Sequence, residues 1–550
     1  MMSDKKYVTY EEFGAVGDGK TNDFEAMMLA HEYANENHLP VKADGTKTYL
    51  IGSTEKDEVA RSIVIKTETD FGGATIIIDD TDIPLSTDKN RDYNGSVFTV
   101  LPEEEMFSLD EEVCKSVGAL KLSDTKINVK LGYPAMIVIY DDDHRAYIRF
   151  GPNANKGEPQ HELLLIDGEG NIDPTTPLMH DYNQVTRIDV IKIEMPYLTV
   201  QNGKFVHRAS HYNTTSFNED GTKVQSKRYF VRNFRISRSN TTVRNLSHYV
   251  EGEISLEDQA NNITGPAYRG FYNALNANNV TIEDCVVTAR RYYTPGTYGF
   301  SAGLTNNIVL RNCRQSNFYI KDERGIDIIS MEKSELTGKP ICWGLGGTSY
   351  CKNMVYDGCE ITRFDAHQGL CNGKIINSKV AMIAIIGFGD MLVENSTLDL
   401  VNSAVIHLRL DYGSTWEGTV TIRNCDITPN EAVVPKNKIT LLNARWHNHY
   451  YGYPCHVPNL VIDNVRIHKR DDVPVYAIAY EKQSRDSDSV MTEPSLHLPI
   501  LSDGVTENKN PLHAPEFMKI INNNQGTEFI FKKLPFFENT KVEGFTIVEE

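Results

Sequence analysis

The chain has 550 residues, of which 40% are hydrophobic, and carries a formal net charge of −19 at pH 7. This acidic balance argues against a nucleic acid as partner, because phosphate binding favours a basic surface, and it mildly disfavours a polyanionic sugar. The length allows a large hydrophobic core or several domains, but no apolar run approaches a membrane span, so no membrane partner is expected.

The first residues, Met-Met-Ser-Asp-Lys-Lys, are not followed by an apolar segment, which predicts that no secretory signal is present. We therefore expect a cytoplasmic protein, or a secreted one whose leader has been removed. Residues 13–23 read Phe-Gly-Ala-Val-Gly-Asp-Gly-Lys-Thr-Asn-Asp and precede a predicted helix at 24–37. Asn22 is the expected cap of that helix, with Glu25 as its capping-box partner.

The string at 13–23 resembles the opening segment of the pectate-lyase-like right-handed parallel β-helix superfamily. In that superfamily a short helix closes the N-terminal end of the solenoid. Its members include glycoside hydrolases, polysaccharide lyases, epimerases, fructan transferases and phage tailspikes. The resemblance therefore implies the fold and leaves the reaction open.

Residues 95–185 differ in sequence pattern from the predicted coils on either side. Residues 135–150 read as a β-hairpin with an acidic turn at 141–144, and a second hairpin is expected around 163–170. The three aspartates of the first turn suggest either a calcium site or, more simply, a solvated turn. We expect an inserted antiparallel module here, with the order of the β-helix resuming at 185–190.

Six later segments repeat one pattern, in which alternating apolar and polar residues lead to Asp, Asn or Gly followed by Cys or Ser. Successive endings lie 18 to 46 residues apart, and 18 residues are too few for a strand, a helix and a returning strand. Such spacing is typical of a solenoid built from short parallel strands. The segments are 280–285, 308–313, 354–359, 375–378, 392–396 and 420–425, and a weaker copy ends at 464.

The predicted fold is therefore all-β, a right-handed parallel β-helix (solenoid) with an N-terminal capping helix and an inserted antiparallel β module. Four regions are expected along the chain. They are 1–94 (N-terminal cap and first β-helix coils), 95–185 (inserted module), 186–470 (β-helix with the active groove) and 471–550 (C-terminal cap).

The nine cysteines support a structural role for thiols, because their number is odd and none forms a Cys-x-x-Cys pair. Cys285, Cys313, Cys359 and Cys425 occupy the same repeat position and should form one buried column, where Cys acts as a small hydrophobe. Free thiols fit a reducing compartment. We expect no metal site and no cofactor, except calcium if the protein is a lyase.

The chemistry is predicted between residues 322 and 449, which contain all three tryptophans of the chain. Their neighbours are Gly, His or other polar residues, which suits aromatic platforms on loops, and sugar rings pack well on such platforms. The expected substrate contacts from this set are Trp343, Trp416, Trp446, His447 and His449.

Two alternating strands, 363–369 and 405–411, bring charged side chains into the same region. Between them, residues 381–387 are almost wholly apolar, as expected for the floor of a groove or for a patch covered by a loop. A surface salt-bridge ladder is the alternative explanation of the charges. The predicted outward positions are Arg363, Asp365 and His367 on the first strand and His407, Arg409 and Asp411 on the second.

Cleavage of a glycosidic bond needs one carboxylic acid to protonate the leaving oxygen and one carboxylate to activate water or to attack. Asp365 and Asp411 are predicted for these roles, with His367 and Arg409 orienting them. Strands two rungs apart would place the carboxylates roughly 9 to 10 Å from each other, near the wide limit for an inverting pair. The alternative partners are Asp327, then Asp322 and Glu323, and more weakly Glu332 and Glu417.

These residues and the resemblance leave three functions open. The favoured one is a glycoside hydrolase acting on a neutral or weakly charged oligo- or polysaccharide. The others are a lyase acting on uronate sugars and a tailspike-like carbohydrate-binding rod, which would trimerise. Homo-oligomers are left open, and no catalytic residue is carried over from a subfamily, because the ordered polygalacturonase signatures and the lyase calcium cluster are absent.

Overall fold

The structure is a computed structural model that describes most of the chain. The predicted fold class is confirmed: the strands form a large, mostly parallel sheet typical of a β-helix, with an N-terminal helix and an inserted antiparallel module. Two compact units are present, unit 1 (1–105, 193–347 and 358–363) and unit 2 (106–192, 348–357 and 364–550). The described residues are 6–52, 61–79, 95–149, 155–208, 215–217, 223–225, 232–251, 270–288, 299–316, 320–321, 327–328, 346–400, 403–429, 438–446, 451–482 and 512–549.

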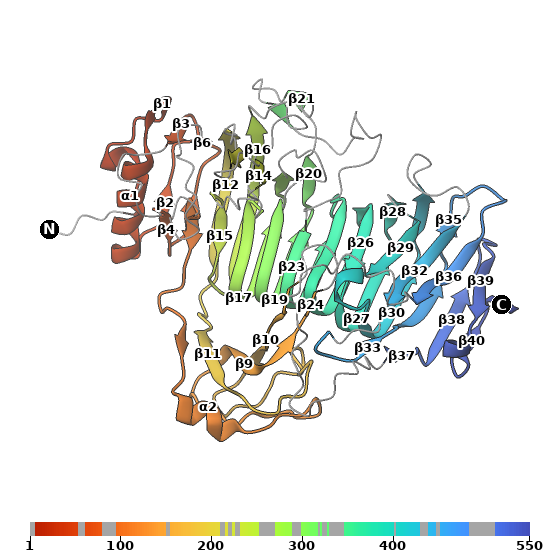
Figure 1. Ribbon diagram of the computed structural model, residues 1–550. Coiled ribbons are helices and arrows are strands. Elements are labelled where there is room, and N and C mark those ends of the chain that lie inside the picture. Colours follow the sequence, from red (N-terminus) through yellow and green to blue (C-terminus); the bar gives the residue numbers. More distant parts are fainter. Residues whose placement is uncertain are drawn as a thin grey trace. The chain divides into compact units, whose positions relative to one another are not determined.

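Unit 1 is built of parallel ladders in which each strand pairs with its equivalent in the next coil (Figure 1). β12 lies beside both β6 and β16, and β17 pairs with β19 along most of its length, from Tyr272↔Phe300 to Glu283↔Arg311. The main strands are β1 (Asp18–Asn22), β3 (Thr48–Ile51), β6 (Thr75–Asp79), β12 (Leu198–Arg208), β16 (Thr241–Glu251), β17 (Tyr272–Glu283) and β19 (Phe300–Arg311), with β2 (Val41–Lys42), β4 (Ile63–Ile65), β5 (Thr69–Asp70), β7 (Phe98–Val100), β15 (Phe234–Ile236), β18 (Val286–Thr288) and β20 (Arg314–Ser316).

Helix α1 (Phe24–Asn37) has the predicted bounds and lies beside β2 and β4 in unit 1 (Figure 1). Its N-cap is Asp23 rather than Asn22, and the Asp23 carboxylate accepts hydrogen bonds from the backbone of Val16 at 2.7 Å and of Leu50 at 3.2 Å. This carboxylate is almost fully buried and ties the N-terminal string to the first coil.

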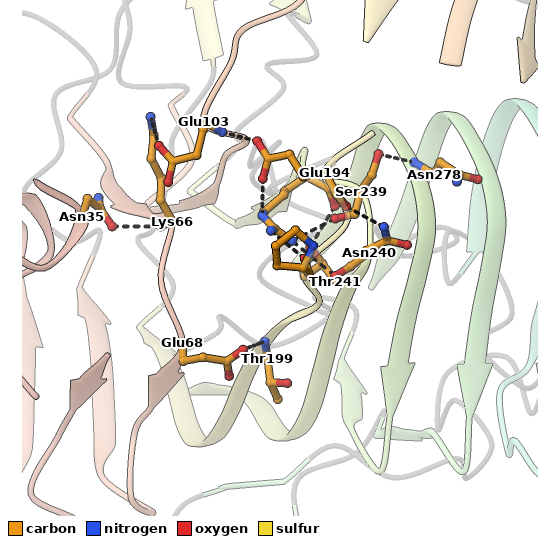
Figure 2. A network of polar contacts seen from close by, with 12 residues as sticks. Asn35, Lys66, Glu68, Glu103, Glu194, Thr199, Ser239, Asn240, Thr241 and Asn278 are labelled. Carbon is orange, nitrogen blue, oxygen red and sulfur yellow. Dashed lines mark hydrogen bonds and ion pairs between the residues drawn. The ribbon is translucent and has the colours of Figure 1, made fainter. Parts of the chain in front are cut away.

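Figure 2 shows the polar contacts that join successive segments of unit 1. The Glu194 carboxylate accepts a hydrogen bond from the backbone of Glu103 and forms an ion pair with Arg238 Nε at 2.8 Å. One rung further, the backbone N–H of Asn278 donates to Ser239 Oγ at 3.0 Å. These bonds satisfy polar groups at the turns, where the ladder itself leaves them unpaired.

Among its described residues, unit 2 has the same kind of architecture, with three parallel ladders of four or more strands. The first contains β23 (Gly346–Asp357), β24 (Arg363–Ile376), β27 (Gly387–Glu394), β30 (Trp416–Arg423), β34 (Asn459–Asp463), β38 (Phe517–Asn522) and β40 (Lys541–Glu543). The second contains β26 (Met382–Ile385), β29 (Ala404–Leu408), β32 (Ile439–Trp446), β36 (Val475–Lys482), β39 (Phe529–Lys533) and β41 (Thr546–Glu549). The third contains β25 (Lys379–Val380), β28 (Thr397–Leu400), β31 (Asp426–Pro429) and β35 (Arg466–Ile467).

Among the described residues of the stretch for which the sequence predicted a C-terminal cap, parallel pairing is present at 475–482 and within 512–549. The repeat pattern fades after residue 470, yet the described strands beyond it still pair in parallel, because ladder hydrogen bonds do not depend on side-chain identity.

The inserted module is an antiparallel sheet of β8 (Phe107–Ser108), β9 (Ala135–Ala146), β10 (Glu158–Ile166) and β11 (Arg187–Lys192), with α2 (Glu111–Val117) beside it. The hairpin predicted over 135–150 is wrong: β9 runs as one strand through the acidic residues and pairs with β10 and β11. The predicted turn near 163–170 is present, since Gly170 N donates to Asp167 O and Ile166 bridges Ile172. β11 belongs to this sheet, so the β-helix order does not resume at 185 but at β12.

The residue before each repeat Cys or Ser adopts a left-handed backbone, as at Asp284, Asn312 and Asn424. Asn, Asp and Gly tolerate this conformation best, which explains why these types fill the position. The thiols that follow are buried, and each donates to a carbonyl of the preceding rung: Cys313 to Ile282 at 3.3 Å, Cys359 to Leu310 at 3.2 Å and Cys425 to Val393 at 3.5 Å. The equivalent positions predicted from the repeats are confirmed within each unit.

Candidate active site

Arg409 of unit 2 joins the two aspartates predicted as catalytic. Strand β29 ends at Leu408, and the chain turns into the 3₁₀-helix η2 (Leu410–Tyr412), which carries Asp411. The Arg409 guanidinium donates through Nη1 to Asp365 Oδ1 at 2.8 Å and through Nη2 to Asp411 Oδ2 at 3.1 Å. One guanidinium therefore holds both carboxylates, and the predicted continuation of the strand to residue 411 is wrong.

The inserted module contributes a second arginine to this cluster. Arg149 Nη2 lies 2.8 Å from Asp411 Oδ2, so that Asp411 is bound by two guanidinium groups. Two carboxylates and two guanidinium groups thus lie together, namely those of Asp365, Asp411, Arg409 and Arg149. We call these four residues the ion cluster.

His367 and Tyr412 adjoin the ion cluster. His367 Nδ1 lies 3.9 Å from Asp365 Oδ2, and its Nε2 lies 3.4 Å from Tyr412 Oη. The guanidinium carbons of Arg149 and Arg409 lie 5.6 and 5.9 Å from the centre of the Tyr412 ring, within the range of cation–π attraction.

The surroundings set the charge of each of these groups. Burial would raise the pKa of Asp411, but the charge and hydrogen bond of Arg409, followed by the charge of Arg149, outweigh it and lower that pKa. Burial, assisted by Arg409, lowers the pKa of His367 to about 4. Burial raises the pKa of Tyr412 to about 12. At neutral pH the site thus combines an ionised Asp411 with a neutral imidazole and a neutral phenol.

Asp365, predicted on the outer face of its strand, has no exposed side-chain surface, whereas Asp411 and His367 are 19% and 20% exposed. The module covers this part of β24: a Cβ added at Gly369 would lie 2.3 Å from Tyr147 Oη. The apolar stretch 381–387 is also buried, apart from partly exposed Met382. It is therefore a covered patch and not the floor of an open groove.

A buried ion pair fastens the module to the coils. Lys352 Nζ lies 2.7 Å from Glu162 Oε2, and both side chains are 1% exposed. The Glu162 carboxylate also accepts the backbone N–H groups of Met179 and His180, while Lys352 donates to the carbonyl of Pro177. Because every charge here has partners, this contact fixes the position from which the module delivers Tyr147 and Arg149.

The tryptophan prediction fails for Trp416, whose side chain is fully buried and donates from Nε1 to Gly389 O at 2.9 Å. It faces the core because β30 alternates, and its neighbour Glu417 takes the outward position. Arg363 is buried in unit 1, and partly buried His407 stands beside Ala384 in the β26–β29 pair. Some predicted site residues lie outside the described residues. They are Trp343, His447 and His449, and the side chains of Trp446 and Asp327.

Sequence reasoning missed Arg149, Tyr147 and Tyr412. The first two lie just after β9, in a module with no repeat pattern to relate it to the coils. Tyr147 has a left-handed backbone (φ 53°) and packs against the rings of Tyr350, Tyr412 and Tyr453. A buried non-glycine residue with positive φ is unusual, and here the surrounding aromatic rings hold it in place.

Within the part of the chain that the structure describes, no group of three or more His, Cys, Asp or Glu side chains is arranged to hold a metal ion. Within the same part, no helix has both the length and the apolar character needed to cross a membrane.

No protein-family model and no curated protein matches the chain. Similar solved structures include the tailspike protein gp49 of Pseudomonas phage LKA1, with 12% identity and a TM-score of 0.49 over 97% of this chain and 84% of that one. Another is the tailspike gp61 of Pseudomonas phage phi297, with 10% identity and a TM-score of 0.48 over 98% and 84%. A third is the gp54 tailspike of Acinetobacter baumannii bacteriophage AP22, in complex with an A. baumannii capsular saccharide, with 9% identity and a TM-score of 0.46 over 98% and 79%. The assignment of the β-helix fold rests on the strand pairing of this chain.

Proposed function

We propose that this chain is a carbohydrate-active β-helix protein that hydrolyses a neutral or weakly charged oligo- or polysaccharide at the ion cluster. The observation that carries the proposal is the state of Asp411, which is partly exposed and kept ionised by Arg409 and Arg149. A carboxylate of this kind can activate a water molecule or attack a sugar carbon.

The roles within the predicted pair change with this geometry. An acid–base pair needs one carboxyl that carries a proton, whereas an arginine placed between two carboxylates favours the ionised form of each. Asp365 also has no exposed surface with which to reach a sugar oxygen. We therefore assign the reacting carboxylate to Asp411, while Asp365 positions Arg409. Asp327, the alternative carboxylate predicted from the sequence, has its side chain outside the described residues.

The charge balance favours a substrate without many acidic groups. The two guanidinium groups of the ion cluster are matched by two carboxylates, so the cluster offers no net positive charge to a uronate. The N-terminal string, fixed by Asp23, supports the further proposal that the chain belongs to the pectate-lyase-like superfamily.

Elimination from a uronate sugar is the second candidate, and the pairing of His367 with Tyr412 favours it. A neutral imidazole can remove a proton, a phenol can protonate a leaving oxygen, and Arg149 beside them can stabilise the developing charge. This alternative predicts unsaturated products and, in such lyases, often a need for calcium.

The test is product analysis with neutral and acidic glycans, with and without a chelator. Hydrolysis predicts new reducing ends without unsaturation, and Asp411→Asn should lower turnover by about 10² to 10⁴. Unsaturated uronate products would support elimination instead. Tight binding of a glycan without turnover would identify a tailspike-like binding rod and contradict the hydrolase proposal.

A further inference from the structure

A second row of side chains crosses neighbouring strands of unit 2, apart from the ion cluster. Phe388 on β27 stands in register with Glu417 on β30. The next strand is β33 (Cys455–His456), which lies beside the start of β30. The backbone N–H of His456 donates to Thr415 Oγ1 at 2.8 Å, and the side-chain Nε2 of His456 lies 3.6 Å from Glu417 Oε2. β37 (Leu512–His513) pairs with β33 and places His513 beside His456. We call Phe388, Glu417, His456 and His513 the Glu–His row.

This row becomes accessible where the module ends. On the two preceding strands, Cys371 of β24 stands beside Phe388, and Lys352 of β23 stands beside Cys371. Both are buried, and Lys352 forms its ion pair with Glu162 of the module. The ring of His180, also from the module, touches Phe388 edge-on at 5.1 Å. Beyond it the side chains of Glu417 and His456 are 42% and 23% exposed, and His513 is exposed.

The chemistry of the row suits a ligand rich in hydroxyl groups. The imidazole rings of His456 and His513 stack at 4.4 Å with 16° between their planes, so that their edges present nitrogen donors and acceptors side by side. Burial lowers the pKa of His456 to about 4 and raises the pKa of Glu417. The row thus offers several hydrogen-bonding groups and an aromatic face, but little positive charge for an acidic polymer.

We infer that the Glu–His row is a second glycan subsite, which binds a stretch of neutral oligosaccharide lying across successive strands. Strands stand about 4.8 Å apart, so that the four side chains span roughly 14 Å, enough for an oligosaccharide rather than a single sugar. The inference rests on the proposed function in one respect, namely that the ligand is a glycan. It does not require that the glycan be cleaved.

The experiment is a calorimetric or NMR titration of the full chain with neutral oligosaccharides, alongside acidic ones of equal length. His456→Ala and His513→Ala should each weaken binding of the neutral ligand about fivefold to tenfold, by loss of hydrogen bonds and ring contact. Glu417→Gln should bind within about threefold of the wild type, because an amide keeps the hydrogen-bonding capacity. The matched control is His468→Ala, which removes an exposed histidine that instead bonds Asp426 at 2.9 Å.

Turnover of the same ligands, measured separately, distinguishes the two proposals. Binding that depends on the row without any cleavage would contradict the hydrolase proposal and support the subsite. Wild-type affinity in both histidine variants, or no binding of any neutral oligosaccharide, would overturn the subsite. Stronger binding of the acidic ligands, with the same dependence on His456 and His513, would overturn the assigned ligand class.

Discussion

Arg149 of the inserted module binds Asp411 of the coils through Nη2, 2.8 Å from Oδ2, and both side chains are 19% exposed. A residue far away in sequence thereby helps Arg409 to lower the pKa of the carboxylate to which we assign the chemistry. The module is part of the candidate site and not an appendage to it.

The first prediction concerns this contact. Arg149 lowers the pKa of Asp411, so Arg149→Met should raise it, and the acidic limb of the pH dependence of kcat/KM should move to higher pH. Arg187→Met is the matched control, because Arg187 lies on the same module over the ring of Tyr140. An acidic limb that stays in place in Arg149→Met would contradict the assignment of Asp411.

The second prediction separates the two aspartates by stability. Asp365 is fully buried against Arg409, so Asp365→Asn removes a charge from a buried pair and should cost about 3 to 5 kcal/mol in the free energy of unfolding. Asp411 is partly exposed, so that water can solvate the guanidinium groups that lose its charge. Asp411→Asn should therefore lower the free energy of unfolding clearly less than Asp365→Asn does. Urea denaturation of both variants measures the difference, and an equal or reversed ranking would refute it.

The third prediction concerns the bond between the module and the coils. Lys352→Met leaves the Glu162 carboxylate buried without its cation and should cost about 3 to 5 kcal/mol. Adding Glu162→Gln should restore part of this loss, because the amide oxygen still accepts the backbone N–H groups of Met179 and His180. A double variant that is less stable than Lys352→Met alone would show that the pair does not act as a unit.

The fourth prediction concerns acid stability. Burial lowers the pKa of His180 from an ordinary 6.5 to about 4, so that below pH 6.5 the unfolded chain binds a proton that the folded chain rejects. The free energy of unfolding should therefore fall as the pH drops from 6.5 towards 4. His180→Phe should make this fall shallower, as measured by denaturant midpoints across that range, and an unchanged slope would contradict the prediction.

The sequence predicted the β-helix well because its cause is local and periodic. Each Asn, Asp or Gly before a repeat Cys or Ser supplies the left-handed turn, and each thiol fills the same inward position, so the repeats mark the coils directly. The helix predicted at 24–37 also has its observed bounds, although its N-cap is Asp23 and not Asn22. The strands after residue 470 were not predicted, because the side-chain pattern fades there although the described strands still pair in parallel.

The candidate site was only partly predictable because burial depends on distant segments. Alternation placed Asp365 outward, and nothing within 363–369 indicates that Tyr147 covers that face. The polar neighbours of Trp416 suggested a loop position, although it is the inward neighbour of Glu417 on a strand. The sequence pointed to Asp411 and to its neighbours on the same segment. Arg149, which pairs with Asp411, could be identified only from the folded structure.

The most direct test of the proposed hydrolysis is to follow cleavage in water enriched in ¹⁸O, with product masses read by mass spectrometry. Hydrolysis at Asp411 predicts that each new reducing end gains one ¹⁸O atom, and that Asp411→Asn forms these products about 10² to 10⁴ times more slowly. Cleaved products without ¹⁸O, or wild-type rates in Asp411→Asn, would contradict it.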